Sequence, residues 1–426
     1  MPLIALLATL VFQPGFHQAL RTSVSTSTRT TYRLKVPIGR AGARLRLSFK
    51  AGDGSLTLHS ATVASAGMQG TLASAPVAVT FGGSSGFSAA ARQRVTSDPI
   101  AFTAAFGAEL YVSFDVDGSL AASTINAFPD SYTYAGSVAA TSSPAGGTTA
   151  MRAVGLDTID IEGEQAPAFV ALGDSITEGY VSGDVGDFVS RHDDYRQAWT
   201  TVAQGLLRLP VANAAVSGQG VDDAIAGLGS EVFPLQGITD CLVLIGTNDL
   251  GAKTEAEIDS RLTTLFDQLR PFCRIWAGIL LPKERTTNGV YATVVSRRHA
   301  VNDFLRHTAR IDGIIDFEPA LAAPGDIDHF GAGFGEDGIH PSIAGQDVMG
   351  RVAAKVLTPP VNIAPPDTTP TPTPVPVPAQ PDPVPASASP PAVAAPAAGG
   401  CNGTGVGTSA LLLLPLLAFF SRRKRR

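Results

Sequence analysis

The sequence is low in charge and has no excess of basic residues. Only 16% of its 426 residues are Asp, Glu, Lys or Arg, whereas 44% are apolar, so the chain is expected to fold around a core. Its formal net charge is -6, although residues 422–426 are all basic. An acidic body argues against nucleic acid as the main partner, because phosphate binding needs a positive surface.

Cysteine is scarce as well. The three cysteines, Cys241, Cys273 and Cys401, have neither zinc-finger nor C-x-x-C spacing. Cys241 and Cys273 each open an apolar run, and if these runs are neighbouring parallel strands, the two sulfurs can lie at the same edge of the sheet. A disulfide would then form in an oxidising compartment, whereas two buried free thiols fit the sequence equally well.

Several motifs for nucleotide or metal chemistry are missing. The chain has no Walker A sequence and no H-E-x-x-H, and residues 217–227 lack the third glycine of a dinucleotide fingerprint. Residues 82–86 (GGSSG) fit the G-x-S-x-G pattern of a nucleophile elbow. They lie between predicted strands with no helix after them, so we interpret them as a turn.

The first 22 residues contain an apolar run that is too short to span a bilayer. Leu3–Phe12 has the length of the apolar part of a signal peptide. We therefore predict a signal peptide over residues 1–22. A buried first strand is the alternative.

The C-terminal part predicts a stalk and a membrane-associated tail. Residues 359–400 are rich in Pro, Ala, Thr and Val, which is typical of an extended linker. Residues 401–426 combine a small-residue patch containing Cys401, an apolar run over 410–420 and a basic end. This tail resembles the Cys-containing sorting tails of myxobacterial and related Gram-negative surface proteins, and a plain membrane anchor is the alternative. Either interpretation predicts a secreted, surface-displayed or outer-membrane-anchored protein.

Between these ends, two folded regions are predicted. Residues 23–165 alternate apolar and polar side chains, as in 43–50 (ARLRLSFK), with Gly, Ser, Asp and Pro between the runs. This pattern predicts antiparallel strands in a β-sandwich or jelly roll. Residues 166–358 instead alternate short apolar runs with helical patterns, which predicts an α/β domain with a parallel sheet covered on both faces. Ligands of such sheets bind beyond the carboxyl ends of the strands.

One of those strand ends presents a serine. In 169–180 (FVALGDSITEGY) an apolar run stops at a glycine and Ser175 follows. A serine needs a base to take its proton, and His340, with Asp337 three residues before it, is the candidate. We favour His340 over its rival His329.

Two further strand ends present groups that can stabilise a developing oxyanion. Asn248, in 243–251 (VLIGTNDLG), has a side-chain amide that can donate a hydrogen bond. Gly218, in 213–220 (NAAVSGQG), can donate its backbone N–H without a side chain blocking the substrate. The N–H of Ser175 is the third candidate donor.

These blocks resemble, in order, the four blocks of the GDSL/SGNH hydrolase family. They are GDSIT, Gly218 in NAAVSGQG, GTND and DGIHP, with Ile176 where the family name has leucine. The resemblance covers residues 168–357 and implies a flavodoxin-like α/β domain without metal or cofactor. It also implies that Ser175 is the nucleophile and that His340 is the base, oriented by Asp337. Ser175, Gly218 and Asn248 would be the oxyanion donors. Asp174 would be a structural acid. The upstream β region is similar to the β domain that precedes some secreted family members.

We therefore predict a serine esterase that acts through an acyl-enzyme. Residues 181–195 and 282–291 are expected to frame the pocket, and both are polar and charged. They favour acylated carbohydrate, most simply acetylated, as the substrate. The alternatives are a lipase or lysophospholipase, which would expose an apolar groove, and a non-catalytic surface protein that binds glycans.

Overall fold

The computed structural model describes residues 10–150, 152–181 and 194–358. The predicted linker over 359–400, the tail over 401–426 and most of the predicted loop over 181–195 lie outside the described residues. Within those residues, none of the helices combines the length and the apolar character needed to cross a bilayer.

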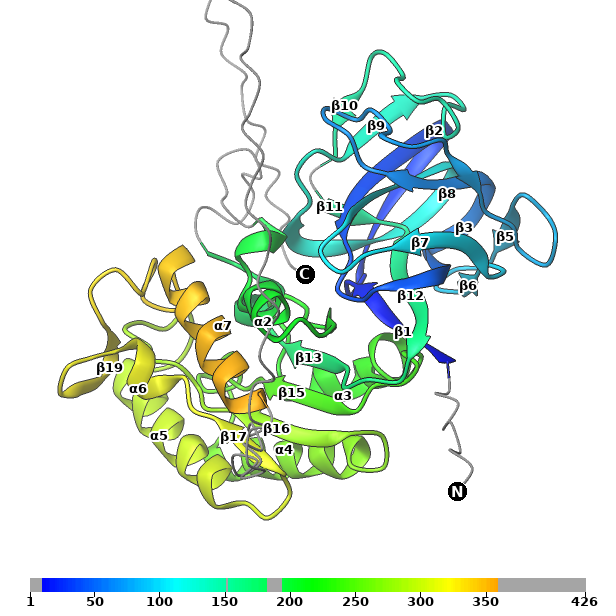
Figure 1. Cartoon of the computed structure of the whole chain (residues 1–426). Coiled ribbons are helices and arrows are strands. Elements are labelled where there is room, and N and C mark those ends of the chain that lie inside the picture. The colour runs from blue at the N-terminus through cyan, green and yellow to red at the C-terminus, as the bar shows by residue number, and fades with distance from the viewer. Residues whose placement is uncertain (1–9, 151, 182–193, 359–426) are drawn as a thin grey trace, which may run out of the picture. The chain divides into compact units, whose positions relative to one another are not determined.

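The N-terminal region is an antiparallel β structure, as predicted (Figure 1). Its strands follow the order β1-β12-β3-β8-β2-β9-β10, with β11 paired to β8 and with β4, β5, β6 and β7 paired to β3. The strands are β1 (Leu10–His17), β2 (Thr22–Pro37), β3 (Gly42–Ser65), β4 (Val77–Ala78), β5 (Phe87–Ala89), β6 (Arg94–Thr96), β7 (Ile100–Ala104), β8 (Glu109–Ala127), β9 (Tyr132–Ala135), β10 (Thr148–Thr149), β11 (Arg152–Val154) and β12 (Leu156–Glu164).

The strands are joined by hydrogen bonds into one continuous network of twelve strands. The reason is β3, whose 24 residues pair first with β12, β6 and β7 and then with β8, β4 and β5. The register shifts between Ala51 and Leu56, and a Cβ on the intervening Gly52 would lie 2.2 Å from Ser23 Oγ. A glycine is therefore required where the long strand changes partners.

The core of this region confirms the predicted alternation. Leu45, Leu47 and Phe49 are buried, and the ring centroid of Phe49 lies 5.1 Å from that of Phe114 on β8. The opposite face of β3 is not solvent-exposed throughout, because Lys50 is also buried. Its ammonium lies 2.6 Å from the Glu231 carboxylate in the α/β region.

The prediction of a signal peptide over residues 1–22 is wrong for its described part. Leu10–His17 is a strand that pairs with β12, and Phe16 and Leu20 are buried. The apolar residues of this segment complete the β core, so the β region begins no later than Leu10 rather than at residue 23. After β1 the chain reaches the α/β sheet, where Ala19 N–H donates to the Asn213 carbonyl at 2.8 Å.

The C-terminal region is an α/β domain around a five-stranded parallel sheet with the order β14-β13-β15-β16-β17 (Figure 1). Helices α2 and α7 pack together, as do α3 with α4 and α4 with α5. The strands are β13 (Phe169–Gly173), β14 (Val211–Asn213), β15 (Asp240–Leu244), β16 (Arg274–Gly278) and β17 (Gly313–Ile315), with a hairpin of β18 (Ala322–Ala323) and β19 (Asp326–Phe330). The helices are α1 (Ser175–Glu178), η1 (Tyr195–Gln197), α2 (Trp199–Leu207), α3 (Val221–Glu231), α4 (Glu255–Leu269), α5 (Tyr291–His307), α6 (Glu318–Leu321) and α7 (Ile343–Leu357).

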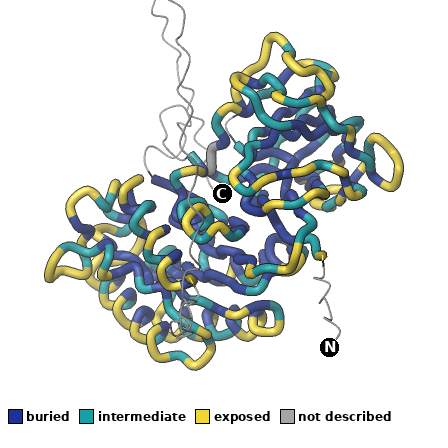
Figure 2. Tube along the Cα trace, viewed as in Figure 1, coloured by how far each residue is buried: buried dark blue, intermediate teal, exposed yellow. Residues whose placement is uncertain are grey.

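The three strands β13, β14 and β15 are buried along their whole length, as the apolar runs predict (Figure 2). Helix α4 buries one apolar stripe, as a helical pattern of apolar residues predicts, namely Ile258, Leu262, Leu265 and Leu269. The strand order changes direction at β13, because β14 is added on one side of it and β15 on the other. In open parallel sheets the crevice at such a point, outside the carboxyl ends of the strands, is where ligands bind.

Candidate active site

Ser175 lies directly after β13, at this crevice. Asp174 is the N-cap of the short helix α1, and its carboxylate accepts from Ile176 N–H at 3.0 Å. Ser175 is the first residue of α1, so its backbone N–H needs no acceptor within the helix and can donate to a ligand. Its Oγ lies 2.8 Å from Nε2 of His340.

His340 is held by Asp337 within one turn of chain. His340 Nδ1 lies 3.0 Å from one carboxylate oxygen of Asp337, and the other oxygen accepts from the backbone N–H of His340 at 2.8 Å. Burial alone would raise the pKa of the Asp337 carboxyl, but these hydrogen bonds and the charge of His340 hold it well below its usual range. The carboxylate therefore stays ionised and fixes the imidazole with Nε2 toward Ser175.

The imidazole is also in contact with an aromatic ring that no sequence motif singled out. The ring of Tyr180, two residues after α1, lies with its centroid 4.2 Å from that of His340. Arg285 adds an ion pair to the Asp337 carboxylate at 3.2 Å. Ser175, His340 and Asp337 thus form one continuous chain of contacts, as predicted.

Gly218 and Asn248 line the same pocket as Ser175. Gly218 has φ +82°, and a Cβ there would meet nothing within 4 Å, so its glycine is required by backbone conformation and leaves the site open. Asn248 donates one amide hydrogen to the Gln219 carbonyl at 3.0 Å, which orients the amide beside the Gly218 loop.

A pocket with a volume of about 170 Å³ connects these groups. The pocket is lined by four of the predicted site residues, namely Ser175, His340, Gly218 and Asn248. Lys283, Thr287 and Asn288 also line the pocket, which confirms that the loop over 282–291 frames it. The remaining lining residues are Tyr180, Ser217, Thr247 and Ile339.

Lys283 is a charged pocket residue that sequence reasoning did not single out. Only 5% of it is exposed, and its ammonium donates to Thr247 Oγ1 at 3.2 Å. Burial lowers the pKa of Lys283, although Asp174 and Asp337 favour its charged form. Its place in a polar loop after β16 was the only available signal.

Asp174 is buried beneath the site and does not line the pocket. Desolvation raises its pKa to about 6, against the opposing effects of the Ile176 N–H and the charge of His340. It is placed to hold the first turn of α1 and so the backbone of Ser175.

The rival histidine and the second serine motif lie elsewhere. His329 is on the exposed hairpin strand β19, where its Nδ1 lies 2.8 Å from the Asp326 carboxylate, and it does not line the pocket. Gly82 and Gly83 both have positive φ in an exposed turn closed by Phe81 and Ser84, as predicted for residues 82–86.

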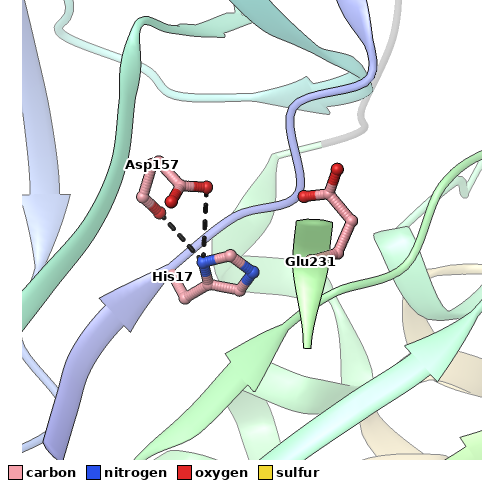
Figure 3. A group of neighbouring side chains, drawn as sticks. All are labelled: His17, Asp157 and Glu231. Atoms are coloured by element: carbon pink, nitrogen blue, oxygen red, sulfur yellow. Dashed lines mark hydrogen bonds and ion pairs between the residues drawn. The ribbon is translucent and has the colours of Figure 1, made fainter. Parts of the chain in front are cut away.

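A second buried cluster joins the β region to α3. Single ligand atoms of His17, Asp157 and Glu231 lie within 4.8 Å of one another (Figure 3). Both carboxylates already have cations, because Arg94 lies 2.6 Å from Asp157 and Lys50 lies 2.6 Å from Glu231. The cluster is therefore a neutralised ion-pair network, in which burial lowers the pKa of His17.

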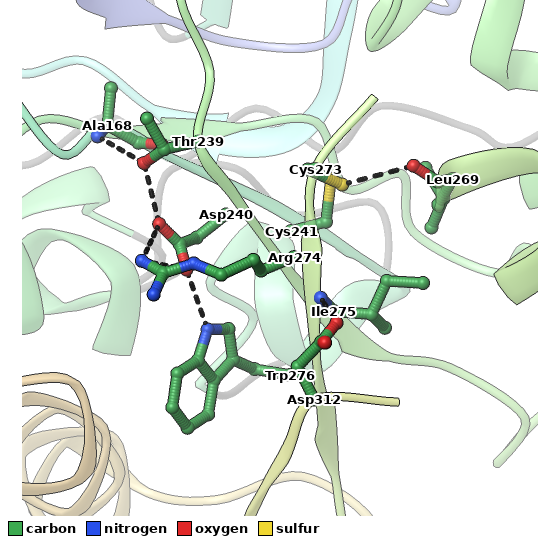
Figure 4. Close-up of a disulfide and its surroundings, with 10 residues drawn as sticks. All are labelled: Ala168, Thr239, Asp240, Cys241, Leu269, Cys273, Arg274, Ile275, Trp276 and Asp312. Carbon is green, nitrogen blue, oxygen red and sulfur yellow. Dashed lines mark hydrogen bonds and ion pairs between the residues drawn. A yellow bond between two sulfur atoms is a disulfide. The ribbon is translucent and has the colours of Figure 1, made fainter. Parts of the chain in front are cut away.

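Cys241 and Cys273 form a disulfide, which settles the question that the sequence left open (Figure 4). Their Cα atoms are 5.8 Å apart, within the range that a disulfide spans. Cys241 lies at the start of β15 and Cys273 directly before β16. The bond therefore lies at the amino end of the parallel sheet, opposite the pocket.

Residues 171–348 match the model of the GDSL-like Lipase/Acylhydrolase family. This part of the chain is a GDSL-like lipase/acylhydrolase domain, and the protein is an enzyme of the ester hydrolase class. The match confirms the resemblance found in the sequence for this domain.

Solved structures of several hydrolases are similar to this domain. A member of the lipolytic protein G-D-S-L family from Veillonella parvula DSM 2008 is 20% identical, with 45% of this chain and 99% of that chain covered and a TM-score of 0.37. An acetylxylan esterase from Geobacillus stearothermophilus is 18% identical, with 45% and 94% covered and a TM-score of 0.34. A carbohydrate acetylesterase from Sinorhizobium meliloti is 18% identical, with 45% and 98% covered and a TM-score of 0.35. No curated protein matches this chain.

Proposed function

We propose that this enzyme hydrolyses carboxylic esters through an acyl-enzyme on Ser175, in a flavodoxin-like domain. The observation that carries the proposal is the contact of 2.8 Å between Ser175 Oγ and His340 Nε2, with Asp337 on the far side of the imidazole. When the strands of the parallel sheet are numbered along the chain, their order across the sheet is 2-1-3-4-5, which is the flavodoxin-like order and supports the fold assignment.

In the first half of the reaction, His340 Nε2 takes the proton of Ser175 while Oγ forms a bond to the carbonyl carbon. The carbonyl oxygen becomes an oxyanion, for which Ser175 N–H, Gly218 N–H and the Asn248 amide are the donors. Collapse of this intermediate breaks the bond to the alcohol oxygen, and His340 gives that oxygen its proton.

In the second half, a water molecule attacks the acyl carbon and gives its proton to His340. The new oxyanion collapses, the bond to Ser175 Oγ breaks, and the proton returns to Oγ as the carboxylic acid leaves. Asp337 stays ionised throughout and stabilises the imidazolium, consistent with its lowered pKa.

We propose acylated carbohydrate, most simply acetylated, as the substrate. The pocket is lined by hydroxyl, amide and ammonium groups of Thr247, Asn248, Lys283, Thr287 and Asn288, which suit a hydroxyl-rich alcohol. A pocket of about 170 Å³ also favours a short acyl group over a long chain. A lipid esterase is expected to have an apolar groove for its substrate. The polar groups that line this pocket therefore favour a carbohydrate ester over a lipid ester.

The test is a series of p-nitrophenyl esters of increasing acyl length, run beside acetate release from acetylated polysaccharides. We expect acetyl to be preferred and acetate to be released, with both activities lost in Ser175→Ala. A preference for long acyl chains would overturn the carbohydrate assignment. Full activity in Ser175→Ala would overturn the mechanism, and no turnover of any ester would favour the glycan-binding alternative.

We further propose that the enzyme acts outside the cytoplasm, held at the cell surface or outer membrane by residues 401–426. The buried disulfide supports an oxidising compartment. Cells that express the full chain should lose esterase activity when protease is added to intact cells. Activity that resists protease until the cells are lysed would contradict this location.

A further inference from the structure

A single carboxylate connects the β region to the Gly218 loop. One oxygen of Glu178 accepts from the backbone N–H groups of Thr124 and Ile125, each at 2.9 Å. The other oxygen accepts from Ser217 N–H at 2.6 Å. Glu178 ends helix α1 and is completely buried, so these bonds are shielded from water.

The two β-region donors belong to an irregular part of β8. Pairing of β8 with β11 shifts register here, because Arg152 is opposite Ala127 whereas Val154 is opposite Ala122. Several residues of β8 therefore face one residue of β11. The N–H groups of Thr124 and Ile125 are directed to Glu178 instead of continuing a regular ladder.

The third donor lies directly before a candidate oxyanion donor. The N–H of Ser217 lies in the peptide unit directly before the one that carries Gly218 N–H, and the two units share the Ser217 Cα, so this bond holds the position from which the Gly218 peptide starts. Gly218 has no side chain to pack and is exposed, so the direction of its N–H depends on how the neighbouring residues are held. On the other side, Gln219 is held by the Asn248 amide and by its own amide, which donates to the Gly173 carbonyl at 2.5 Å.

A second contact joins the same elements. Ala19 N–H donates to the Asn213 carbonyl at 2.8 Å, so the segment after β1 continues the edge of the parallel sheet. The Asn213 amide donates to the Thr177 carbonyl at 3.0 Å, and its oxygen accepts from Ala215 N–H at 3.1 Å. The β region thus contacts Glu178 in the segment after Ser175 and Asn213 in the segment before Gly218.

We propose that Glu178 is a positioning residue through which the β region sets the direction of the Gly218 N–H during ester hydrolysis. The proposal rests on the proposed function and assigns the β region a role in it. Bonds from N–H to a carboxylate are stronger than neutral ones, so the two bonds from β8 hold the carboxylate firmly and its bond to Ser217 N–H holds the loop. A displacement of about 1 Å in an active site can cost about 10²-fold in rate.

Glu178→Gln is the first test, because glutamine keeps the shape but has only one accepting oxygen. It cannot accept from β8 and from Ser217 together. We expect kcat for p-nitrophenyl acetate to fall by about 10- to 100-fold while KM changes by less than about twofold, since an oxyanion donor acts mainly in the transition state.

The matched control is Glu231→Gln. Glu231 is also buried and also bonds the β region, through Lys50 at 2.6 Å, but it ends α3 and does not line the pocket. We expect this variant to unfold at lower urea concentration with kcat unchanged. An equal fall of kcat in both variants, or an unchanged kcat in Glu178→Gln, would overturn the proposal.

A measurement on the wild-type enzyme covers the case in which Glu178→Gln does not fold. A phosphonate on Ser175 places an oxygen among the oxyanion donors, so hydrogen exchange of the Ser217 and the Thr124–Ile125 amides should slow together. Slower exchange at Ser217 alone would overturn the proposal. If the wild-type enzyme neither hydrolyses esters nor takes up phosphonate, the proposed function fails instead, which separates the two outcomes.

Discussion

The two ends of the parallel sheet are held by different interactions. At the amino end, a disulfide joins Cys241 to Cys273, and the buried carboxylate of Asp240 accepts from Arg274 and Trp276 at 2.9 and 2.8 Å (Figure 4). At the carboxyl end, no covalent bond joins the described loops, and they meet through side-chain contacts around a pocket.

The two ends of the sheet therefore have different roles, since the amino end contributes to stability and the carboxyl end carries the catalytic groups. The amino end brings neighbouring strands together with a bond that is independent of substrate. The carboxyl end holds an ionised acid, an imidazole and a serine from loops that are 165 residues apart in the sequence. Changes at the amino end should therefore lower stability and leave turnover intact, whereas changes of the catalytic side chains at the carboxyl end should lower turnover.

The largest effect is expected from Asp337→Asn, which tests the carboxyl end. The amide no longer favours the required imidazole orientation and charge, so kcat should fall by about 10³- to 10⁴-fold. Asp326→Asn is the control, because Asp326 bonds His329 with the same three-residue spacing on the exposed hairpin. Equal kcat values for the two variants in an ester assay would contradict the assignment.

Removal of the disulfide tests the amino end. The bond closes a separation of 32 residues, so Cys241→Ser with Cys273→Ser should lower the free energy of unfolding by roughly 3 to 4 kcal/mol. Urea unfolding measures this loss, and kcat at 25 °C should match the wild type. A fall of kcat before any unfolding would show that the two ends are not independent.

The smallest effect is expected from Asp174→Asn, which should change how the free energy of unfolding depends on pH. The folded pKa of Asp174, about 6, is above its unfolded value, so the folded state binds the extra proton between about pH 4 and 6. The wild type should therefore lose up to roughly 3 kcal/mol of stability as pH rises through that window, because burial disfavours the charged carboxylate.

Asparagine does not titrate and can still accept from Ile176 N–H, so Asp174→Asn should lack this component of the pH dependence. Urea unfolding at pH 4, 5, 6 and 7 gives the difference in stability between the two proteins. That difference should change in favour of the variant as pH rises to 6. A difference that is constant with pH would contradict the raised pKa.

The sequence carried most of the information about the carboxyl end. Ser175, Gly218, Asn248 and His340 each follow a predicted strand, and parallel strands bring their carboxyl ends to one edge. The apolar runs and the stripe on α4 identified the elements between them. The loop over 282–291 was placed correctly because it follows a strand on the same edge.

What the sequence did not reveal depends on contacts between regions distant in the chain. Lys50 is one of the polar residues in the alternation over 43–50, yet it is buried and pairs with Glu231, which ends α3. Residues 1–22 were assigned to a signal peptide because the apolar run Leu3–Phe12 has that length, but Leu10–His17 is a strand of the β core. Glu178 has no local pattern that marks it, since its partners are backbone N–H groups of β8 and of the loop after β14.

Covalent labelling tests the central claim most directly, which is that Ser175 is activated by His340. The full chain is incubated with a fluorophosphonate and analysed by peptide mass spectrometry. We predict one phosphonate per chain, on Ser175, none in Ser175→Ala, and a much slower reaction in His340→Ala. An enzyme that hydrolyses esters while Ser175 stays unlabelled, or that is labelled at another residue, would contradict the account.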